Sequence, residues 1–323
     1  MAEFGYLLPT RGIVQSSADT ADITERTRTD ITERASTVES LGFSAIWAGD
    51  SVLAKPRHEP LLTLAAVATA TDSIDLGTAV YLPALRNPVH VAHQTVTLDQ
   101  LSGGRFRFGI GVGSGPDVKA EYGNLDVPYR ERGPRTDELL DIVTRLWDGE
   151  TVTYDGRFYQ LEDANLGFRP ARTPPIYVPT AAFDPTDGFP APIARRLATH
   201  GDGWLPTAIA PDTYHGSLDG VHDILADAGR DPSALDHAAY VNVAIDDDED
   251  AAIGMARDFF DAYFPARDPM SADAIRGGGA VGTPAQVAER IDEYVDAGVE
   301  TFVVRFVAPD QQRQLERFAD AVF

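Results

Sequence analysis

Cysteine is absent from the 323 residues of this chain. Its absence excludes disulfide bridges, a thiolate nucleophile and thiolate-ligated metal or iron–sulfur sites. No apolar run approaches the roughly 18 residues that a membrane-spanning helix needs. The N-terminus opens Met-Ala-Glu-Phe, without the basic start and apolar stretch of a signal peptide. We therefore expect a cytoplasmic protein that does not enter a membrane.

Lysine is also scarce: Lys55 and Lys119 stand against 25 arginines, and 35 Asp with 15 Glu bring the net charge to −23. This charge disfavours binding to nucleic acid or to anionic membranes. Short, hydrated carboxylates on a surface with few lysines favour solubility in concentrated salt, because salt screens the self-repulsion. The composition is thus typical of a protein from a salt-loving archaeon. An ordinary acidic cytosolic protein is the alternative, and it leaves the missing lysines unexplained.

Strand-like and helix-like segments alternate along the whole chain, which is typical of an α/β protein with a parallel sheet. Eight short apolar runs are predicted strands: 4–8, 44–48, 74–80, 106–112, 176–178, 203–205, 239–245 and 301–307. Eight strands, each followed by a helix, predict a (β/α)8 TIM barrel, which takes about 250 residues and leaves roughly 70 for insertions in the loops after the strands. An open doubly wound sheet is the alternative. No linker is visible, so we expect one domain over residues 1–323.

The insertions and the helix starts have their own signals. Residues 151–161 read as an extra hairpin, and residues 180–192 and 265–282 read as Gly/Pro-rich loops. The clearest helix begins at Thr283-Pro-Ala-Gln, a capping box with proline at the first helical position. Val287, Ile291 and Val295 are then predicted to share its buried face.

In a barrel of this kind the functional site lies in the loops that follow the strands. Four basic residues fall in these loops: Arg11, Lys55, Arg57 and Arg86. They suggest an anionic ligand, because Arg and Lys side chains hold phosphate or carboxylate groups well. Pairing with the abundant surface Asp residues is the alternative.

The run Gly109-Ile-Gly-Val-Gly-Ser-Gly at the end of the fourth strand indicates close backbone approach, either to a flat ligand or to a tight neighbour. It is not a dinucleotide-binding fingerprint, because Ser114 stands where the third glycine belongs. The seven histidines form no metal-ligand signature, so we expect no metal. The chain has neither a G-x-S-x-G elbow nor a Walker loop, which disfavours hydrolysis and phosphoryl transfer.

Four segments, in this order, resemble the bacterial-luciferase-like superfamily of flavin-dependent and coenzyme F420 (deazaflavin) dependent oxidoreductases. They are Gly42-Phe-Ser-Ala-Ile-Trp-Ala-Gly-Asp, Leu76-Gly-Thr-Ala-Val, Thr97-Leu-Asp-Gln-Leu-Ser-Gly-Gly-Arg-Phe running into the glycine strand, and Asp202-Gly-Trp-Leu-Pro. The Leu-Ser-Gly-Gly-Arg part is the most specific. The resemblance covers essentially the whole chain and implies a TIM barrel, a cofactor ring at the carboxyl ends of the strands, and a homodimer.

The resemblance also implies site residues. Those for the cofactor are Asp50, Ala79, Val80, Gly111, Val112, Gly113, Ser114, Thr180 and Ala181, the last two for its phosphate. It further implies a non-proline cis peptide between Ala79 and Val80. Asp50 is a candidate catalytic residue as well. Many deazaflavin-dependent members have a His directly after this Asp as a proton donor; here Ser51 stands, and His58 is the candidate substitute. Strand five is commonly followed by Gly-Gly, whereas here Pro179-Thr180 follows.

We therefore expect an oxidoreductase that uses reduced coenzyme F420 for hydride transfer to or from a small organic substrate. A deazaflavin has carbon in place of the flavin N5, so it moves hydride and activates oxygen poorly, whereas FMN can do both. One alternative is an FMN-dependent monooxygenase supplied with reduced flavin by a separate reductase. Another is a non-catalytic flavin-binding protein, because Ser51 removes an expected acid. The expected partner is a small molecule, with neither nucleic acid nor membrane.

Overall fold

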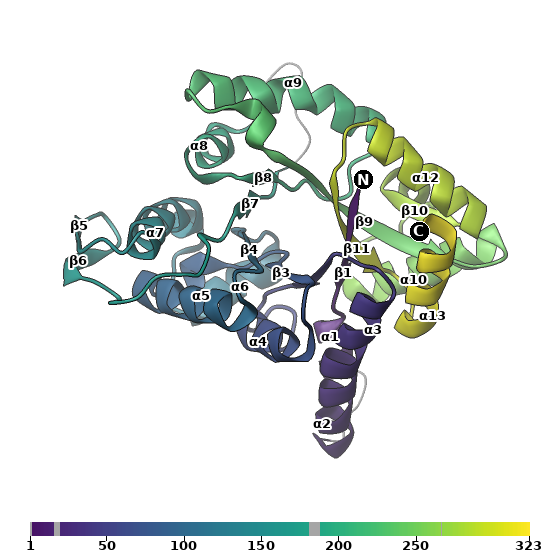
Figure 1. Ribbon diagram of the computed structural model, residues 1–323. Helices are drawn as coiled ribbons and strands as arrows, with labels where there is room; N and C mark the ends of the chain where they lie inside the picture. Colours follow the sequence, from purple (N-terminus) through teal and green to yellow (C-terminus); the bar gives the residue numbers. More distant parts are fainter. Residues whose placement is uncertain (1, 16–19, 181–187, 266) are drawn as a thin grey trace. The chain divides into compact units, whose positions relative to one another are not determined.

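The computed structural model describes residues 2–15, 20–180, 188–265 and 267–323. The chain divides into two compact units. The first unit is Met1–Leu7, Thr37–Ala45 and Pro179–Phe323, and the second unit is Leu8–Ser36 and Ile46–Val178. Each unit consists of strands alternating with helices (Figure 1).

The second unit carries most of the residues predicted for the site. Its strands are β2 (Ala45–Ala48, all but the first residue), β3 (Asp75–Thr78), β4 (Phe106–Gly109), β7 (Ile176–Val178) and the hairpin of β5 (Val152–Asp155) and β6 (Gln160–Ala164). Its helices are α1 (Thr10–Gln15), α2 (Thr20–Arg28), α4 (Pro60–Ala70), α5 (Pro88–Ser102), α6 (Pro116–Asn124) and α7 (Arg132–Trp147). Strand β4 pairs in parallel with β3 and with β7, and α5 lies alongside α4 and α7 (Figure 1).

The first unit is built on longer parallel pairings. Its strands are β1 (Glu3–Leu7), β8 (Gly203–Trp204), β9 (Asp236–Ile245), β10 (Gly279–Gly282) and β11 (Thr301–Phe306). Its helices are α8 (Ala191–His200), α9 (Pro211–Asp227), α10 (Glu249–Tyr263), α11 (Ala272–Gly277), α12 (Pro284–Asp296) and α13 (Gln311–Val322), and α3 (Arg34–Ser40) is divided between the units. Its strands lie in the order β10-β9-β11-β1, and β8 also pairs with β9.

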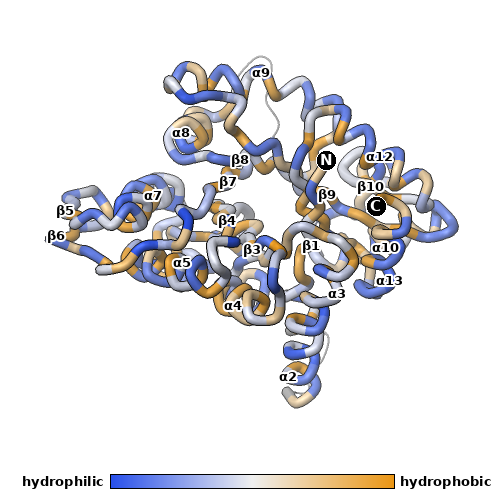
Figure 2. Tube along the Cα trace, in the orientation of Figure 1, coloured by the Kyte–Doolittle hydropathy of each residue, from blue (hydrophilic) through white to orange (hydrophobic). Residues whose placement is uncertain are grey.

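Each unit has its own apolar interior. In the second unit Ile46, Leu76 and Phe106 have no exposed surface, and in the first unit the same holds for Phe302 and Val304. Figure 2 shows the apolar residues along strands such as β1 and β9, while the helices alternate between apolar and polar residues. This is the pattern of helices that bury one face against a sheet.

All eight predicted strands form, with ends shifted by a few residues. The hairpin predicted at 151–161 is confirmed as β5 and β6, which pair antiparallel. The predicted capping box is confirmed, since the Thr283 and Gln286 side chains each accept the other residue's backbone N–H.

Two expectations about elements are wrong. Residues 265–282 are not only loop, because they contain α11 and the strand β10. Val295 is 40% exposed, and Tyr294 takes its place on the buried face of α12 with Val287 and Ile291. The spacing 287, 291 and 294 follows the helix period more closely than 287, 291 and 295. Among the described residues, no helix has the length and apolar character to cross a membrane.

Candidate functional site

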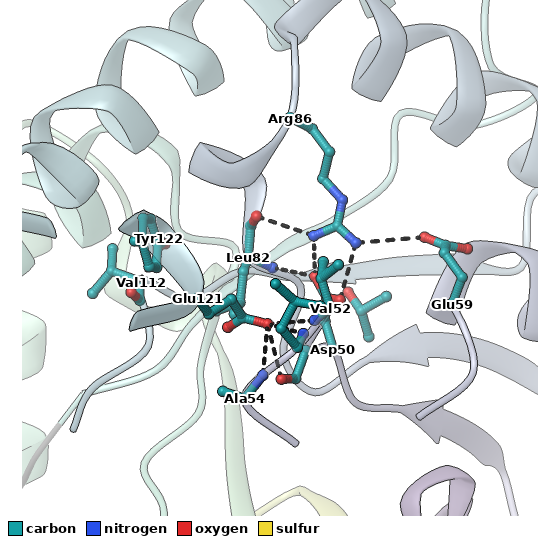
Figure 3. A network of polar contacts seen from close by, with 12 residues as sticks. Asp50, Val52, Ala54, Glu59, Leu82, Arg86, Val112, Glu121 and Tyr122 are labelled. Carbon is teal, nitrogen blue, oxygen red and sulfur yellow. Dashed lines mark hydrogen bonds and ion pairs between the residues drawn. The ribbon is translucent and has the colours of Figure 1, made fainter. Parts of the chain in front are cut away.

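Asp50 lies two residues beyond β2 and its carboxylate is almost completely buried, with 1% of the side chain exposed. Both of its oxygens accept hydrogen bonds. The two terminal nitrogens of Arg86 donate one to each oxygen, and the backbone N–H of Leu82 donates a third at 2.9 Å (Figure 3). A guanidinium that grips a carboxylate with two parallel donors fixes both groups in one geometry. Asp50 therefore ties the end of β2 to the segment that follows β3.

Arg86 has further partners that complete its surroundings. Its guanidinium lies 4.3 Å from the centre of the Tyr81 ring, donates to the Leu82 carbonyl at 3.2 Å and approaches Glu59 Oε1 to 3.8 Å. Burial by itself lowers the pKa of Arg86, but the charge and hydrogen bonds of Asp50, together with Tyr81 and Glu59, outweigh it and the pKa is raised. Burial raises the pKa of Glu59, although Leu62 and Arg86 oppose this. Arg86 is thus neutralised by carboxylates of the chain itself, contrary to the expectation that it faces an anionic ligand.

Glu121 on α6 is the second buried carboxylate of the site, with 1% of the residue exposed. Its Oε1 accepts hydrogen bonds from the Ser51 hydroxyl at 3.0 Å and from three consecutive backbone N–H groups, those of Val52, Leu53 and Ala54, at 2.5, 2.7 and 3.3 Å (Figure 3). Its Oε2 is also buried and has no hydrogen-bond partner in the described part of the chain. The loop after β2 is therefore wrapped around a carboxylate from another element.

The peptide bond between Ala79 and Val80 is cis, as the sequence analysis predicted. The Ala79 N–H donates to the Ala48 carbonyl at 2.9 Å, which joins the ends of β3 and β2. The glycines of β4 and just beyond it face this segment. A Cβ on Gly109 would lie 1.9 Å from the Thr78 carbonyl oxygen, and one on Gly111 would lie 2.4 Å from Cγ2 of Val80. Of the two explanations for the glycine run, a tight neighbour accounts for these two positions.

The next residues, 112–115, lead from β4 into α6. The Val112 carbonyl accepts from the Tyr122 hydroxyl at 3.1 Å, and the Gly113 carbonyl accepts from Arg132 Nε at 3.2 Å. Gly113 has a φ of 64°, in the left-handed region that favours glycine. Ser114 is exposed. The backbone of this segment is thus fixed by side chains beneath it.

His58 lies on the loop after β2, with Nε2 3.0 Å from the Thr27 hydroxyl and with Nδ1 buried and without a partner among the residues described. Burial lowers the pKa of His58, so the ring is neutral at physiological pH. Arg57 shares this loop. Its Nε donates to the Lys55 carbonyl at 3.2 Å, and its Nη1 lies 2.3 Å from where a Cβ on Gly49 would be, beside the Ala79 carbonyl. Arg57 thus lies near the end of β2, and its assignment to an anionic ligand stays a prediction.

Thr180 belongs to the first unit, where its buried hydroxyl accepts from Trp204 Nε1 at 2.5 Å. Ala181 lies outside the described residues. The assignment of both to a cofactor phosphate stays a prediction. No group of three or more His, Asp or Glu side chains that could hold a metal ion occurs among the described residues.

The sequence analysis missed Glu121 as part of the site, and for Arg86 the structure shows its alternative, pairing with an Asp residue, in place of an anionic ligand. Ser51, which stands where many deazaflavin-dependent relatives have His, was noticed, but its bond to Glu121 was not. Asp50 and Arg86 are 36 residues apart, and Ser51 and Glu121 are 70 apart. Carboxylates are so common in this chain that no local pattern distinguishes these two.

The comparison with protein families identifies the chain. A model described as luciferase-like monooxygenase matches residues 1–301. The chain belongs to this family. Among curated relatives of this luciferase-like protein is the F420-dependent hydroxymycolic acid dehydrogenase of Mycobacterium tuberculosis, 35% identical over 71% of this chain and 62% of that protein, so the match spans less than two thirds of the relative. The 5,10-methylenetetrahydromethanopterin reductase of Archaeoglobus fulgidus is 28% identical over 86% of this chain and 90% of its own length.

Solved structures show the fold of this luciferase-like protein. An F420-dependent secondary alcohol dehydrogenase in complex with an F420-acetone adduct covers 99% of this chain and 98% of its own, with a TM-score of 0.82 and 22% identity. The oxygenating constituent of 3,6-diketocamphane monooxygenase from Pseudomonas putida, in complex with FMN, covers 100% and 98% with a TM-score of 0.74 and 19% identity. The predicted fold is confirmed: the chain has the α/β, TIM-barrel-like luciferase fold. It is an enzyme of the luciferase-like family of F420- or flavin-dependent oxidoreductases.

Proposed function

We propose that this protein uses coenzyme F420 for hydride transfer to or from a small organic substrate. The observation that carries the proposal is the set of F420-dependent dehydrogenases among its curated relatives, with matches over 71% to 91% of this chain at 26% to 35% identity. The net charge of −23 supports it from a different side, because salt-loving archaea, which this composition indicates, are rich in the deazaflavin.

The residues present fit such a cofactor. Ala79 offers a small side chain next to the end of β3, and the backbone becomes progressively more exposed from the buried Gly111 to the exposed Ser114. At Gly115, where α6 begins, no atom lies within 4 Å of the position of a Cβ. The backbone N–H groups of a first helical turn lack helical acceptors and suit an anionic group. Ala79, Val80 and residues 111–114 would hold the ring, and the assignment of the phosphate to Thr180 and Ala181 rests on the resemblance alone.

When bound, F420 supplies a carbon atom that accepts or donates a hydride. The chain's own residues must orient the substrate, exclude water and handle the proton. Asp50 serves as an acceptor that fixes Arg86 and the Leu82 backbone, so we assign it a role in shaping the cofactor side of the site. His58 is the candidate acceptor for the proton that leaves an alcohol oxygen as its carbon loses hydride; Nε2 contacts the Thr27 hydroxyl, so Nδ1, which is buried and has no partner among the described residues, would take the proton.

A second candidate is an FMN-dependent monooxygenase, which is favoured by the fold likeness to the FMN complex described above. Titration of the protein in molar salt with oxidised F420 and with FMN separates the two, because each cofactor changes its fluorescence on transfer from water into a protein site. We expect F420 to bind at least tenfold more tightly than FMN. Tighter binding of FMN would favour the second candidate, and binding of neither would refute both.

The variant His58→Gln tests the role of His58. We expect His58→Gln to keep the affinity for F420 within about threefold of wild type and to lose most of the turnover. In the wild type, turnover should rise with pH through a pKa below the usual 6.5 of histidine, because the neutral ring is the active form. A turnover that falls with rising pH over this range would exclude His58 as the base.

A further inference from the structure

The loop after β2 is held from inside by Glu121. Three consecutive backbone N–H groups of the loop, from Val52 to Ala54, donate to one oxygen of the Glu121 carboxylate. The same oxygen accepts a hydrogen bond from the Ser51 hydroxyl. The Ser51 oxygen in turn accepts the Lys55 N–H at 2.8 Å, which closes the loop. Successive N–H groups that point to one centre form an anion-binding nest, and here the anion is a side chain of the protein itself.

Burial of a carboxylate is costly unless donors surround it. No Lys, Arg or His forms an ion pair with Glu121 among the described residues, so backbone dipoles and the Ser51 hydroxyl take the place of a cation. Glu121 itself lies on α6. Its four donors all come from the loop after β2, and the shape of that loop is what it determines.

The shape of the loop determines which of its side chains are exposed. Because the amides of Val52 and Leu53 turn inward to Glu121, their side chains turn outward, and they are 44% and 51% exposed. They stand two and three residues after Asp50, in the loop at the carboxyl end of a strand, where sites of this fold lie. Two large apolar side chains held outward by a rigid backbone form a surface suited to contact an apolar group.

We propose that Glu121 is a positioning residue that sets the loop Ser51–Ala54, and that Val52 and Leu53 on this loop select substrates with an apolar group beside the reacting carbon. The inference rests on the proposed function. Ser51 is then part of the loop's internal support, since its hydroxyl is engaged with Glu121 and the Lys55 N–H.

The chain offers a matched control for Glu121. Glu138 on α7 also accepts two backbone N–H groups, those of Arg157 and Phe158, each at 2.9 Å, but these belong to the turn of the β5–β6 hairpin. We compare Glu121→Ala, Glu121→Gln and Glu138→Ala. The glutamine keeps an acceptor oxygen for the loop and removes the charge, so it should rescue most of what the alanine loses.

Amide hydrogen exchange and F420 titration are the two readouts. In Glu121→Ala we expect at least tenfold faster exchange at Val52, Leu53 and Ala54 and at least tenfold weaker F420 binding, with Glu121→Gln within about threefold of wild type and Glu138→Ala unchanged in both. Unchanged exchange and affinity in Glu121→Ala would overturn the positioning role. If the wild type binds no F420, the proposed function fails, while the exchange rates still decide whether Glu121 holds the loop.

A series of secondary alcohols from 2-propanol to 2-octanol tests the selecting surface, with the fluorescence of bound F420 as the signal. In the wild type we expect affinity to rise by up to about fourfold per methylene, the factor that corresponds to burial of one CH₂. The Val52→Ser/Leu53→Ser variant should lose this dependence. No dependence in the wild type, or the same dependence in the variant, would overturn the assignment. So would a change of oligomeric state in the variant, because the two residues would then belong to an interface between copies.

Discussion

The ion pair between Asp50 and Arg86 yields the most quantitative prediction about the stability of the site. Removal of one partner from a buried pair costs about 3 to 5 kcal/mol, because the other charge stays buried without compensation. Arg86 keeps 18% of its side chain exposed, so we take the lower end, about 3 kcal/mol, for Arg86→Met. With an unfolding entropy of about 2.1 cal/mol/K per residue over 323 residues, this lowers the melting temperature by about 4 °C.

The double variant distinguishes a pair from two independent contributions. Asp50→Asn/Arg86→Met removes both charges together, and the double loss should be smaller than the sum of the single losses by about 2 kcal/mol. Urea unfolding of the four proteins in one molar-salt buffer measures this coupling. The reasoning is refuted if Arg86→Met melts within 1 °C of the wild type, or if the two single losses simply add.

Three further outcomes follow from other features. Gly111→Ala should lose about 1 to 3 kcal/mol of stability, because its Cβ would lie 2.4 Å from Val80. The control Gly123→Ala on α6, where no atom lies near the added Cβ, should be neutral or gain up to about 1 kcal/mol. Equal urea midpoints for the two variants would contradict the clash. Burial, and after it the charge of His222, lowers the pKa of His237. The unfolded chain therefore binds the proton more strongly, and the stability should fall as the pH drops below about 6.5. A His237→Asn variant should lose part of this dependence of stability on pH, and an identical dependence would exclude the histidine as its source. The melting temperature should rise from low to molar salt, since a net charge of −23 repels itself until it is screened, and a flat or falling curve would contradict the halophilic interpretation.

Local patterns were sufficient to predict most of the elements. Strands such as 176–178 are apolar runs bounded by proline or glycine, and the capping box at Thr283 depends only on residues three apart. Strand β10 was missed because Gly-Ala-Val-Gly is short and glycine-rich, with a composition typical of a loop. Tyr294 replaced Val295 on the buried face of α12 because one residue rotates the helix face by about 100°.

The candidate site depends on contacts between residues far apart in the sequence, which no local pattern predicts. The resemblance predicted the cis peptide at Ala79 and the position of Asp50, since both belong to short motifs. Arg86 was predicted to bind an anion because its location after β3 is visible in the sequence, but its partner Asp50 is not. Glu121 reaches a loop 67 to 70 residues away, and only the folded backbone brings the two together.

Hydride transfer without oxygen is the central claim, and anaerobic turnover tests it most directly. The wild-type protein in molar salt is mixed under nitrogen with oxidised F420 and a panel of small primary and secondary alcohols, and the visible absorbance of the deazaflavin is followed while the carbonyl product is quantified. We predict that at least one alcohol reduces F420 and yields one carbonyl per cofactor reduced. The claim is contradicted if no alcohol in the panel reduces F420 while the same protein, supplied with reduced FMN and oxygen, oxygenates a substrate.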